Sequence, residues 1–409
     1  MSRLTPLFTS VAILLLGHGL QLSLLPLRAD AMGWSSSQIG LSSSFYFGGF
    51  LLGCFSIPGF VRAVGHIRVF TVLTSIMTAA LLCLSIFERL VAWLLLRLII
   101  GWSIAGLYLV IESWLNEEVG NEQRGSLLSL YTIVVLSAMA GGQLLLNLAD
   151  PTSFHLVIIA SMCIALAAVP VGLTQIAQPG PVPPANFSPF LIFRTAREAA
   201  VSSFAAGVVM GCFYGLGPVF AAQLGLNVSG ISIMMGAGIT GGALFQWPLG
   251  RLSDRMDRRV VILLSMLAAT GICALITIAA PAYLPHLVFL FGACVMPIYA
   301  LSLAHAGDNV EGSFLEVGTG ILIVNAVGAT IGPVLASLAM EVWGARSFFV
   351  FCGATILVGA FLMLFYTRRR PALRPHFSRF ELATTASAQG AIELDPRSDE
   401  DCKDSKPID

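Results

Sequence analysis

The sequence predicts an all-α membrane protein with twelve transmembrane helices arranged as two six-helix halves. Three observations support this prediction: the composition, the number of long apolar runs and an internal repeat. Of the 409 residues, 56% are hydrophobic and only 11% are charged, and the mean hydropathy is +0.86. Soluble domains carry about 25% charged residues, so this composition excludes a soluble globular protein. Most of the chain is therefore expected to lie in a lipid bilayer.

Twelve apolar runs are each close to the roughly 20 residues that cross a bilayer. Backbone N–H and C=O groups need internal partners in hydrocarbon, so each run is expected to form an α-helix. An outer-membrane barrel would show alternating strands of about ten residues, and the sequence lacks them. The predicted spans are residues 7–27, 39–61, 69–87, 91–115, 126–148, 154–174, 201–222, 231–249, 260–280, 285–306, 316–340 and 346–366.

The first apolar run can be interpreted either as a transmembrane helix or as a secretory signal peptide. Arg3, an apolar run and Ala29-Asp30-Ala31 have the order of a signal and its cleavage site. The run from Leu7 to Leu27 is too long for the apolar core of a signal, and the same segment recurs near Gly211. We therefore expect it to remain as the first transmembrane helix.

The arginines predict the orientation of the chain. With the N-terminus in the cytoplasm, fifteen arginines up to Arg379 fall on cytoplasmic segments and three on the opposite loops. Positive side chains favour the cytoplasmic face, so both termini are expected there. The predicted divisions are residues 1–174 for the first half, 175–200 for a proline-rich cytoplasmic linker, 201–366 for the second half and 367–409 for a cytoplasmic tail. The tail has little apolar surface to bury and is expected to be disordered.

The internal repeat aligns the two halves at a spacing of 191–192 residues. Glycines, prolines and the ends of the spans fall at equivalent positions throughout this alignment. Chance identities in a Gly- and Leu-rich chain would not show this regularity. The matched pairs are Gly19 with Gly211, Pro26 with Pro218, Gly33 with Gly225, Gly49 with Gly241, Gly101 with Gly292, Tyr108 with Tyr299, Glu117 with Asp308, and Gly141 with Gly332. Halves of this kind are related by an axis along the membrane normal.

A charged loop at residues 250–259 stands out from the apolar runs on either side. Its sequence, GRLSDRMDRR, is expected to connect two helices, the first ending at Gly250 and the second starting at Val260. It resembles the signature loop G-x-L-x-D-R-x-G-R-R of the major facilitator superfamily, with Asp257 where the family prefers Gly. The matching residues are Gly250, Leu252, Asp254, Arg255, Arg258 and Arg259.

This resemblance covers residues 1 to about 370 and implies the fold and function of that superfamily. It implies that substrate binds near the midplane between the halves, which rock to expose it to either side. The charged loops would act as conformational latches that pair across the cytoplasmic interface in one state. The equivalent loop of the first half contributes Arg62, Gly65 and Arg68. Arg62 stands where Asp254 stands in the second half, so it needs an acidic partner; Glu112, Glu117 and Glu118 are candidates.

Two further motifs support the resemblance, and a third is missing. Arg97-Leu-Ile-Ile-Gly101 resembles the R-x-x-x-G of the fourth span, whose Arg is often linked to proton coupling. The segment Glu112–Asn116 is similar to the YcaD-like branch of the superfamily. The G-P-x-x-G-G of many exporters is absent from the fifth span, where Gly141-Gly142 stands instead. The direction of transport therefore stays open.

Ionisable residues inside a membrane are costly and mark functional sites by default. Arg97 is a fixed charge that either binds an anion, tunes the pKa of an acid or snorkels to the headgroups. Glu112 lies about 60° away on the same helix. It carries a proton for coupling, or it makes a structural ion pair near the cytoplasmic end. Arg97 and Glu112 are the candidate coupling residues, with the proton as the expected coupling ion.

Several polar residues are candidates for lining the substrate cavity. His18 lies near the midplane of the first span and titrates near neutrality, although a lone intramembrane His also occurs as a packing residue. In the superfamily, spans one, four, seven and ten line the central cavity. For each candidate taken singly, packing is an equally good interpretation. The candidates are His18, Gln21, Tyr108, Tyr214, Tyr299, His305 and Asn325.

The sequence predicts a secondary transporter for a small neutral or amphipathic solute. One inward arginine is too few for a dicarboxylate. No Walker loop, G-x-S-x-G or H-E-x-x-H occurs, so an enzyme is not expected. No cofactor, metal or nucleic-acid partner is expected, because the net charge is zero and no cysteine pair has metal-ligand spacing. We expect a monomer in a bacterial inner membrane. The alternatives are a non-transporting receptor on the same fold and a polytopic membrane enzyme.

Overall fold

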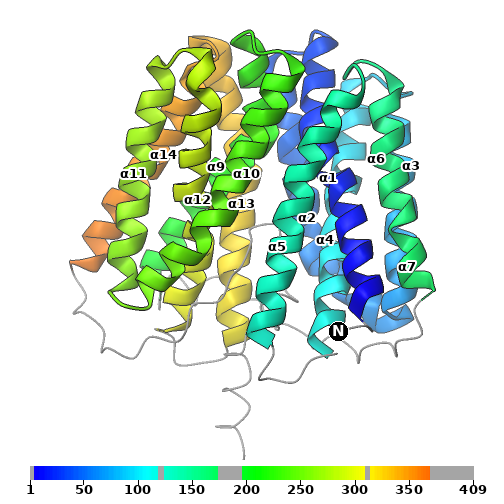
Figure 1. Ribbon diagram of the computed structural model, residues 1–409, viewed down its shortest axis with the longest axis horizontal. Helices are drawn as coiled ribbons and strands as arrows, with labels where there is room; N and C mark the ends of the chain where they lie inside the picture. The colour runs from blue at the N-terminus through cyan, green and yellow to red at the C-terminus, as the bar shows by residue number, and fades with distance from the viewer. Residues whose placement is uncertain (1–3, 118–123, 174–195, 309–313, 369–409) are drawn as a thin grey trace, which may run out of the picture.

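The computed structural model describes residues 4–117, 124–173, 196–308 and 314–368. Within these ranges twelve helices are long and apolar enough to cross a membrane, which confirms the predicted number (Figure 1). Most of the predicted linker and almost all of the predicted tail lie outside the described residues. The helix α9 begins at Arg197, inside the segment predicted to be the linker.

Several of the helices are longer than the predicted apolar runs, because polar residues extend them beyond the hydrocarbon. The first half holds α1 (Thr5–Ala31), α2 (Ser36–Val64), α3 (His66–Leu84), α4 (Leu90–Glu117), α5 (Arg124–Leu144), η3 (Leu145–Leu148), α6 (Phe154–Leu166) and α7 (Ala168–Gly172). The second half holds α9 (Arg197–Gln223), α10 (Val228–Ser253), α11 (Arg258–Ile278), η4 (Pro281–Tyr283), α12 (Leu284–Gly307), α13 (Phe314–Trp343) and α14 (Ser347–Thr367).

The turns that follow the first helix of each half are alike. Gly33 and Gly225 have φ of 79° and 83°, a left-handed conformation that glycine adopts without strain. Each turn leads into a capped helix. Ser35 forms a capping box at the start of α2, and the Asn227 side chain accepts a hydrogen bond from the Gly230 N–H at the start of α10. The glycine and the cap residue of each turn therefore end one helix and start the next.

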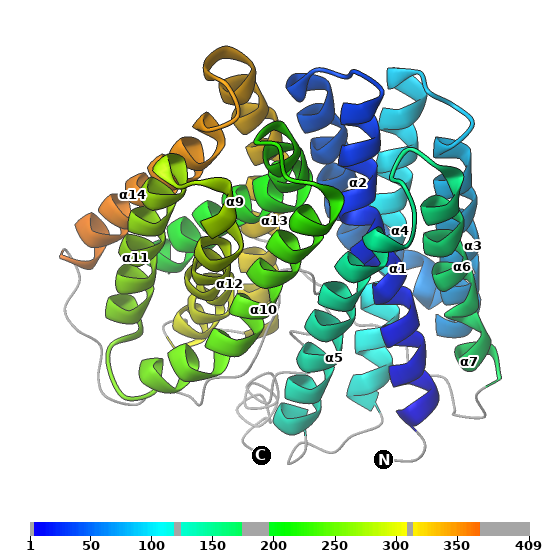
Figure 2. The same ribbon diagram turned by 45° about the horizontal axis from the view of Figure 1, so that its top comes forward.

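The two halves stand side by side, and α1 begins on the same side as α14 ends (Figures 1 and 2). We call this the terminal side and the other the opposite side. The helices at the centre are more buried than those at the rim. In an apolar 18-residue stretch of each helix, 94% of the residues are buried in α9 and 83% in α1, against 39% in α6 and in α11. The corresponding share is 72% in α4 and in α12. Spans one, four, seven and ten are thus central, as expected from the resemblance.

Close helix crossings confirm the internal repeat. A methyl group on Gly19 would lie 2.5 Å from the Met139 carbonyl oxygen, where α1 crosses α5. A methyl group on Gly211 would lie 2.7 Å from the Cα of Ala329, where α9 crosses α13. Only glycine permits backbones to approach so closely. The same correspondence relates Gly49 against Leu98 to Gly241 against Phe289, and Gly101 against Tyr46 to Gly292 against Gly238.

One predicted match of the repeat is displaced by a residue. Gly332 packs against the Val208 carbonyl group, and the equivalent contact in the first half is made by Gly142 against the Leu16 carbonyl oxygen. Gly141 meets only the Leu16 side chain. The structural counterpart of Gly332 is therefore Gly142 rather than Gly141, because the backbone contact decides which glycine the crossing requires.

Hydrogen bonds between the halves gather toward the opposite side. Near the start of α2, the Ser37 N–H donates to Glu341 Oε2 at 3.3 Å and Ser43 Oγ donates to the Gly215 carbonyl at 3.2 Å. At the start of α10, Ser232 Oγ donates to the Gln143 carbonyl at 2.6 Å. Toward the terminal side a hollow of ≈ 540 Å³ separates α5 from α10. The halves therefore meet on the opposite side and diverge toward the terminal side.

Candidate functional site

A small cavity lies where the two halves meet. Most of its lining side chains are apolar or aromatic, and they come from α1, α2, α4, α5, α9 and α13. Water-sized spheres can occupy ≈ 40 Å³ of it, which is room for about three water molecules. A substrate therefore needs side chains or helices to move apart. The lining residues are His18, Leu22, Tyr46, Phe47, Phe50, Tyr108, Met139, Met210, Gly211, Tyr214, Leu322, Asn325, Ala326 and Ala329.

A chain of polar groups runs through the first-half wall of this cavity. Gln21 Nε2 lies 3.0 Å from His18 Nδ1, and His18 Nε2 lies 3.2 Å from the Tyr46 hydroxyl. The Tyr108 ring stands edge-on to His18, with ring centroids 6.4 Å apart. All four side chains are at most 4% exposed. His18 is therefore held by two partners on opposite sides of its ring and faces the cavity in a fixed orientation.

Arg97 lies behind this wall. Its side chain is 2% exposed and its guanidinium carbon is 4.6 Å from the centroid of the Tyr46 ring. Within the described part of the chain, Arg97 Nε and Nη1 have no hydrogen-bond partner and no carboxylate forms an ion pair with Arg97. Tyr46 lines the cavity and Arg97 does not, so the aromatic ring separates the charge from the space where substrate would bind.

The contact with the Tyr46 ring alone does not offset the free-energy cost of burying the Arg97 charge. A cation–π contact contributes about 0.5–2 kcal/mol, whereas burying an ion costs several kcal/mol after relaxation. Arg97 also leaves two nitrogen atoms unsatisfied, and each buried unsatisfied donor adds a further cost of about 1–3 kcal/mol. A buried charge with this net free-energy cost is expected at a position where the charge is needed for function.

Glu112 lies on α4 one turn beyond Tyr108, toward the terminal side. Its side chain is fully buried and accepts a hydrogen bond of 3.1 Å from the Tyr131 hydroxyl. Its carboxylate also lies within electrostatic range of Tyr108 and Tyr299. Glu112 and Arg97 are both buried.

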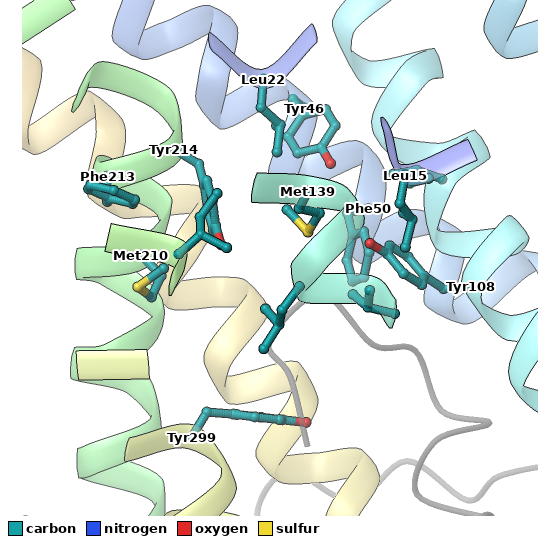
Figure 3. Close-up of a cluster of buried hydrophobic side chains, with 14 of the residues drawn as sticks. Leu15, Leu22, Tyr46, Phe50, Tyr108, Met139, Met210, Phe213, Tyr214 and Tyr299 are labelled. Atoms are coloured by element: carbon teal, nitrogen blue, oxygen red, sulfur yellow. The ribbon is translucent and has the colours of Figure 1, made fainter. Parts of the chain in front are cut away.

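Of the seven predicted cavity residues, four line the cavity: His18, Tyr108, Tyr214 and Asn325. Gln21 contacts the cavity only through His18. Tyr299 is buried on α12, away from this cavity (Figure 3). His305 lies near the end of α12, in electrostatic range of Glu198 and Asp257. Asn325 also has a packing role, because its Nδ2 donates to the Ser203 carbonyl at 2.9 Å and joins α13 to α9.

The charged loop is shorter than the sequence predicted. The helix α10 continues past Gly250 to Ser253, and α11 begins at Arg258, so only residues 254–257 connect the helices. The Gly250 carbonyl accepts hydrogen bonds from the Asp254 N–H and from Ser253 Oγ. Charged residues at a helix end reach water or a partner, so hydropathy underestimates the length of the helix.

Arg258 anchors this loop within the second half. Its side chain is fully buried, and its Nε donates to Asp308 Oδ2 at 2.6 Å. Its Nη1 donates to Ser253 Oγ at 2.9 Å and lies 3.3 Å from Asp254 Oδ1. Arg258 therefore ties the ends of α10, α11 and α12 together. The pairs of Arg258 with Asp254 and Asp308 both lie inside the second half.

Asp257 caps α11 where the family prefers Gly. Its carboxylate accepts from the Arg259 backbone N–H at 2.9 Å and pairs with Arg259 Nη2 at 2.6 Å. Burial alone raises the pKa of Asp257, but the hydrogen bonds and charge of Arg259 outweigh burial and hold the pKa below its ordinary value. The equivalent Gly65 has φ of 87°, whereas Asp257 has φ of −54°. The second half thus replaces a special backbone conformation with a side-chain cap.

The equivalent loop of the first half lacks this network among the described residues. Arg62 and Arg68 are exposed, and no ion pair joins Arg62 to Glu112. Glu112 is buried against Tyr131 instead. The side chains of Glu117 and Glu118 are not among those that the structure describes. The predicted pairing of Arg62 with Glu112 is therefore not made in this conformation.

Sequence reasoning missed three residues of the site. Tyr46 lines the cavity and contacts both His18 and Arg97, but it lies on the second span, which was not expected to contribute. Asp308 was matched in the repeat without a role. Glu198, at the start of α9, is 2% exposed and lies near Arg259. A signal existed for Asp308, since Arg258 and Asp308 each adjoin the end of an apolar run.

The comparisons with known proteins agree with this architecture. The sequence profile of the Major Facilitator Superfamily matches residues 199–396. The "Uncharacterized MFS-type transporter YcaD" of Salmonella newport (strain SL254) is 27% identical over 346 residues, which cover 84% of this chain and 90% of that protein. The chain thus resembles transporters of the major facilitator type over most of its length. The YcaD protein of Salmonella paratyphi A is also 27% identical, over 331 residues.

Solved structures of this superfamily share the fold. The nucleoside transporter NupG superposes with a TM-score of 0.77 at 15% identity, covering 90% of this chain and all of that one. A bacterial homologue of the human lysosomal transporter Spinster, in an inward-facing and occupied conformation, superposes with a TM-score of 0.74 at 14% identity over 92% of this chain and 98% of that one. At this identity the two structures establish the major facilitator fold of the chain.

Proposed function

We propose that this transporter moves a small amphipathic solute by alternating access. The observation that carries the proposal is the position of the cavity. It lies between the halves, and the hydrogen bonds that join the halves gather to one side of it. Rocking of the halves about this junction would close the terminal side and open the opposite side. The mostly apolar lining suits the body of such a solute.

The proton gradient is the proposed energy source. Glu112 is a buried carboxylate between the cavity and the terminal side, and its hydrogen-bond donor Tyr131 is also buried. A carboxylate in such surroundings exchanges a proton when the halves separate and water reaches it. Arg97 and His18 would complete the coupling set, because they place a fixed charge and a titratable ring on the first-half wall of the cavity.

Asp254 and Arg255 are the groups that we propose to pair across the interface when the terminal side closes. The Asp254 side chain is 30% exposed and Arg255 is exposed, whereas Arg258 is fully buried in its own half. Arg62 and Arg68, also exposed, are the candidates on the first half. The excess of arginines on these loops supports placing the terminal side in the cytoplasm of a bacterial inner membrane.

Flux through proteoliposomes tests this function. The purified chain would be screened against sugars, amino acids, drugs and organic acids for stabilisation on heating, since a ligand of the folded state adds RT ln(1 + [L]/Kd). A stabilising compound would then be followed into vesicles with and without a pH gradient. Binding without flux would support the receptor alternative.

Glu112→Gln is the variant that tests proton coupling, and Glu88→Gln, on an exposed loop, is its matched control. We expect Glu112→Gln to lose the stimulation by an imposed pH gradient and Glu88→Gln to keep it. Uptake that is indifferent to the gradient in the wild type, with Glu112→Gln unchanged, would rule out proton coupling.

A further inference from the structure

The first-half wall of the cavity is rich in hydrogen-bond donors and poor in acceptors. Arg97 Nε, Arg97 Nη1 and the Tyr108 hydroxyl are buried without a partner among the described residues. Among the described residues of this wall, Gln21 Oε1 is the unsatisfied atom that can only accept, and it lies on the far side of His18 from Tyr46. Such an excess of donors beside a buried cation is complementary to an anion rather than to a neutral or cationic group.

We propose that the solute carries one carboxylate, which binds where Tyr46, His18 and Tyr108 meet, in the field of Arg97. This inference rests on the proposed function, since it names the class of solute that the cavity takes. It replaces a general amphipathic compound with an amphipathic monoanion. A single cation serves the wall, so one carboxylate balances it and a second would be buried without compensation.

The proton arrangement of the His18 chain supports this orientation. An amide nitrogen can only donate, so Gln21 Nε2 donates to His18 Nδ1, which must then carry no proton. His18 Nε2 consequently bears the proton and donates to the Tyr46 oxygen at 3.2 Å. The Tyr46 hydroxyl keeps its own proton for a further acceptor. The chain therefore ends in a donor at the cavity, beside the Tyr108 hydroxyl.

The place of Arg97 explains how one charge acts without lining the cavity. Its guanidinium stacks on the Tyr46 ring at 4.6 Å, and the Tyr46 hydroxyl lies against His18. Electrostatic attraction is weakly screened inside a protein, so the Arg97 charge attracts a carboxylate bound on the other side of the Tyr46 ring. Rotation of Tyr46 toward the solute would additionally expose Arg97 Nε and Nη1 to the carboxylate, which matches their fork geometry.

The remainder of the cavity fits an apolar body. Met139 lies between Tyr214 and the tyrosines of the first half, and Met210 lies beside Tyr214 on the second-half side (Figure 3). Methionine side chains adapt to ligands of different shape. Asn325 is the one polar lining residue of α13, and its amide nitrogen is engaged by Ser203. We therefore expect the anionic group to bind the first half and the apolar body to reach the second half.

Matched acid–amide pairs test the proposal in proteoliposomes. The compounds would be 4-phenylbutyrate, indole-3-acetate, 2-naphthylacetate and octanoate, each compared with its own amide at pH 7. The variants would be Arg97→Gln, Arg97→Lys and Tyr46→Phe, with Arg89→Gln as the control on an exposed loop before α4. A charge-assisted contact corresponds to about a tenfold to hundredfold change in affinity. We expect at least one acid to be taken up at least tenfold better than its amide.

The variants separate the outcomes. Arg97→Gln should abolish the preference for acid, Tyr46→Phe should weaken it, and Arg97→Lys and Arg89→Gln should retain it. If Arg97→Gln does not fold, the ratio in Tyr46→Phe decides, and an unchanged ratio overturns the proposal. Amide uptake equal to acid uptake, or an acid preference that survives Arg97→Gln, overturns the anionic class and leaves transport standing. No uptake of any acid or amide above empty vesicles counts against the proposed transport as well.

Discussion

Replacing Arg258 by Ala is expected to destabilise the protein more than any change at an exposed arginine of the same loop. Arg258 is fully buried and Asp308 is only 5% exposed, so their 2.6 Å pair has little solvent screening. Removing one partner of a buried ion pair costs about 3–5 kcal/mol, because the remaining charge stays buried. Asp254 contributes less to this figure, since its side chain is 30% exposed. Arg255→Ala, three positions earlier and exposed, should change stability by at most about 0.5 kcal/mol.

The assay is thermal unfolding of the purified protein in one detergent, followed by tryptophan fluorescence and by the fraction that stays monodisperse. The charge-free variant Arg258→Met with Asp308→Leu provides the second test. Replacing both members of a buried pair by apolar residues is often nearly neutral, so this variant should unfold well above Arg258→Ala. Two results would refute the reasoning: equal unfolding temperatures for Arg258→Ala and Arg255→Ala, or a double variant no better than the single one.

Three other predictions follow from the described contacts. Gly19→Ala should destabilise by about 1–3 kcal/mol, because its methyl group would lie about 0.9 Å inside the shortest ordinary contact of 3.4 Å; Gly271→Ala, with nothing within 4 Å, should be neutral or stabilising in the same melting assay. The lowered pKa of Asp257 means that its stabilisation is present above its unfolded pKa of about 4 and is lost as pH falls through the lower folded value. The melting temperature of Asp257→Asn should therefore lie below the wild type at pH 7 and approach it below pH 4, and a constant gap would contradict the pairing with its arginine. Tyr131→Phe removes the hydrogen-bond donor of Glu112, so it should raise the pH at which transport is half-maximal; an unchanged pH profile would assign Tyr131 to packing alone.

Much of the fold could be predicted because hydropathy and the repeat report backbone requirements directly. Gly19 and Gly211 align in sequence because both let two helix backbones touch, and the crossing of α1 with α5 returns as that of α9 with α13. Helix ends were less predictable. The helix α10 runs beyond Gly250, and Arg258 pairs with Asp254 and Ser253 at its end while Asp308, distant in sequence, holds Arg258 in place.

The site was less predictable, because a side chain's surroundings depend on packing between spans. Arg97 is conspicuous in an apolar run, but the sequence does not show whether an acid faces it. Tyr46 was missed because it lies on the second span, whereas only spans one, four, seven and ten were expected to line the cavity. His305 was expected beside the substrate, yet its position near the end of α12 places it among charged groups, where Glu198 and Asp257 lie near.

The contacts between the halves have an energetic consequence. The hydrogen bonds described there comprise one to the Glu341 carboxylate, bonds from serine hydroxyls to backbone carbonyls, and bonds from the Asn147 and Gln223 amides to serine hydroxyls. Each bond contributes roughly 0.5–1.5 kcal/mol net, so parting them requires a few kcal/mol. An equilibrium of this size can be reversed by a differential affinity of about 5.5 kcal/mol, which one tightly bound small molecule can supply. The contacts between the halves are thus weak enough for binding of the solute to shift the conformational equilibrium. The close glycine contacts between helices keep each half rigid as it moves.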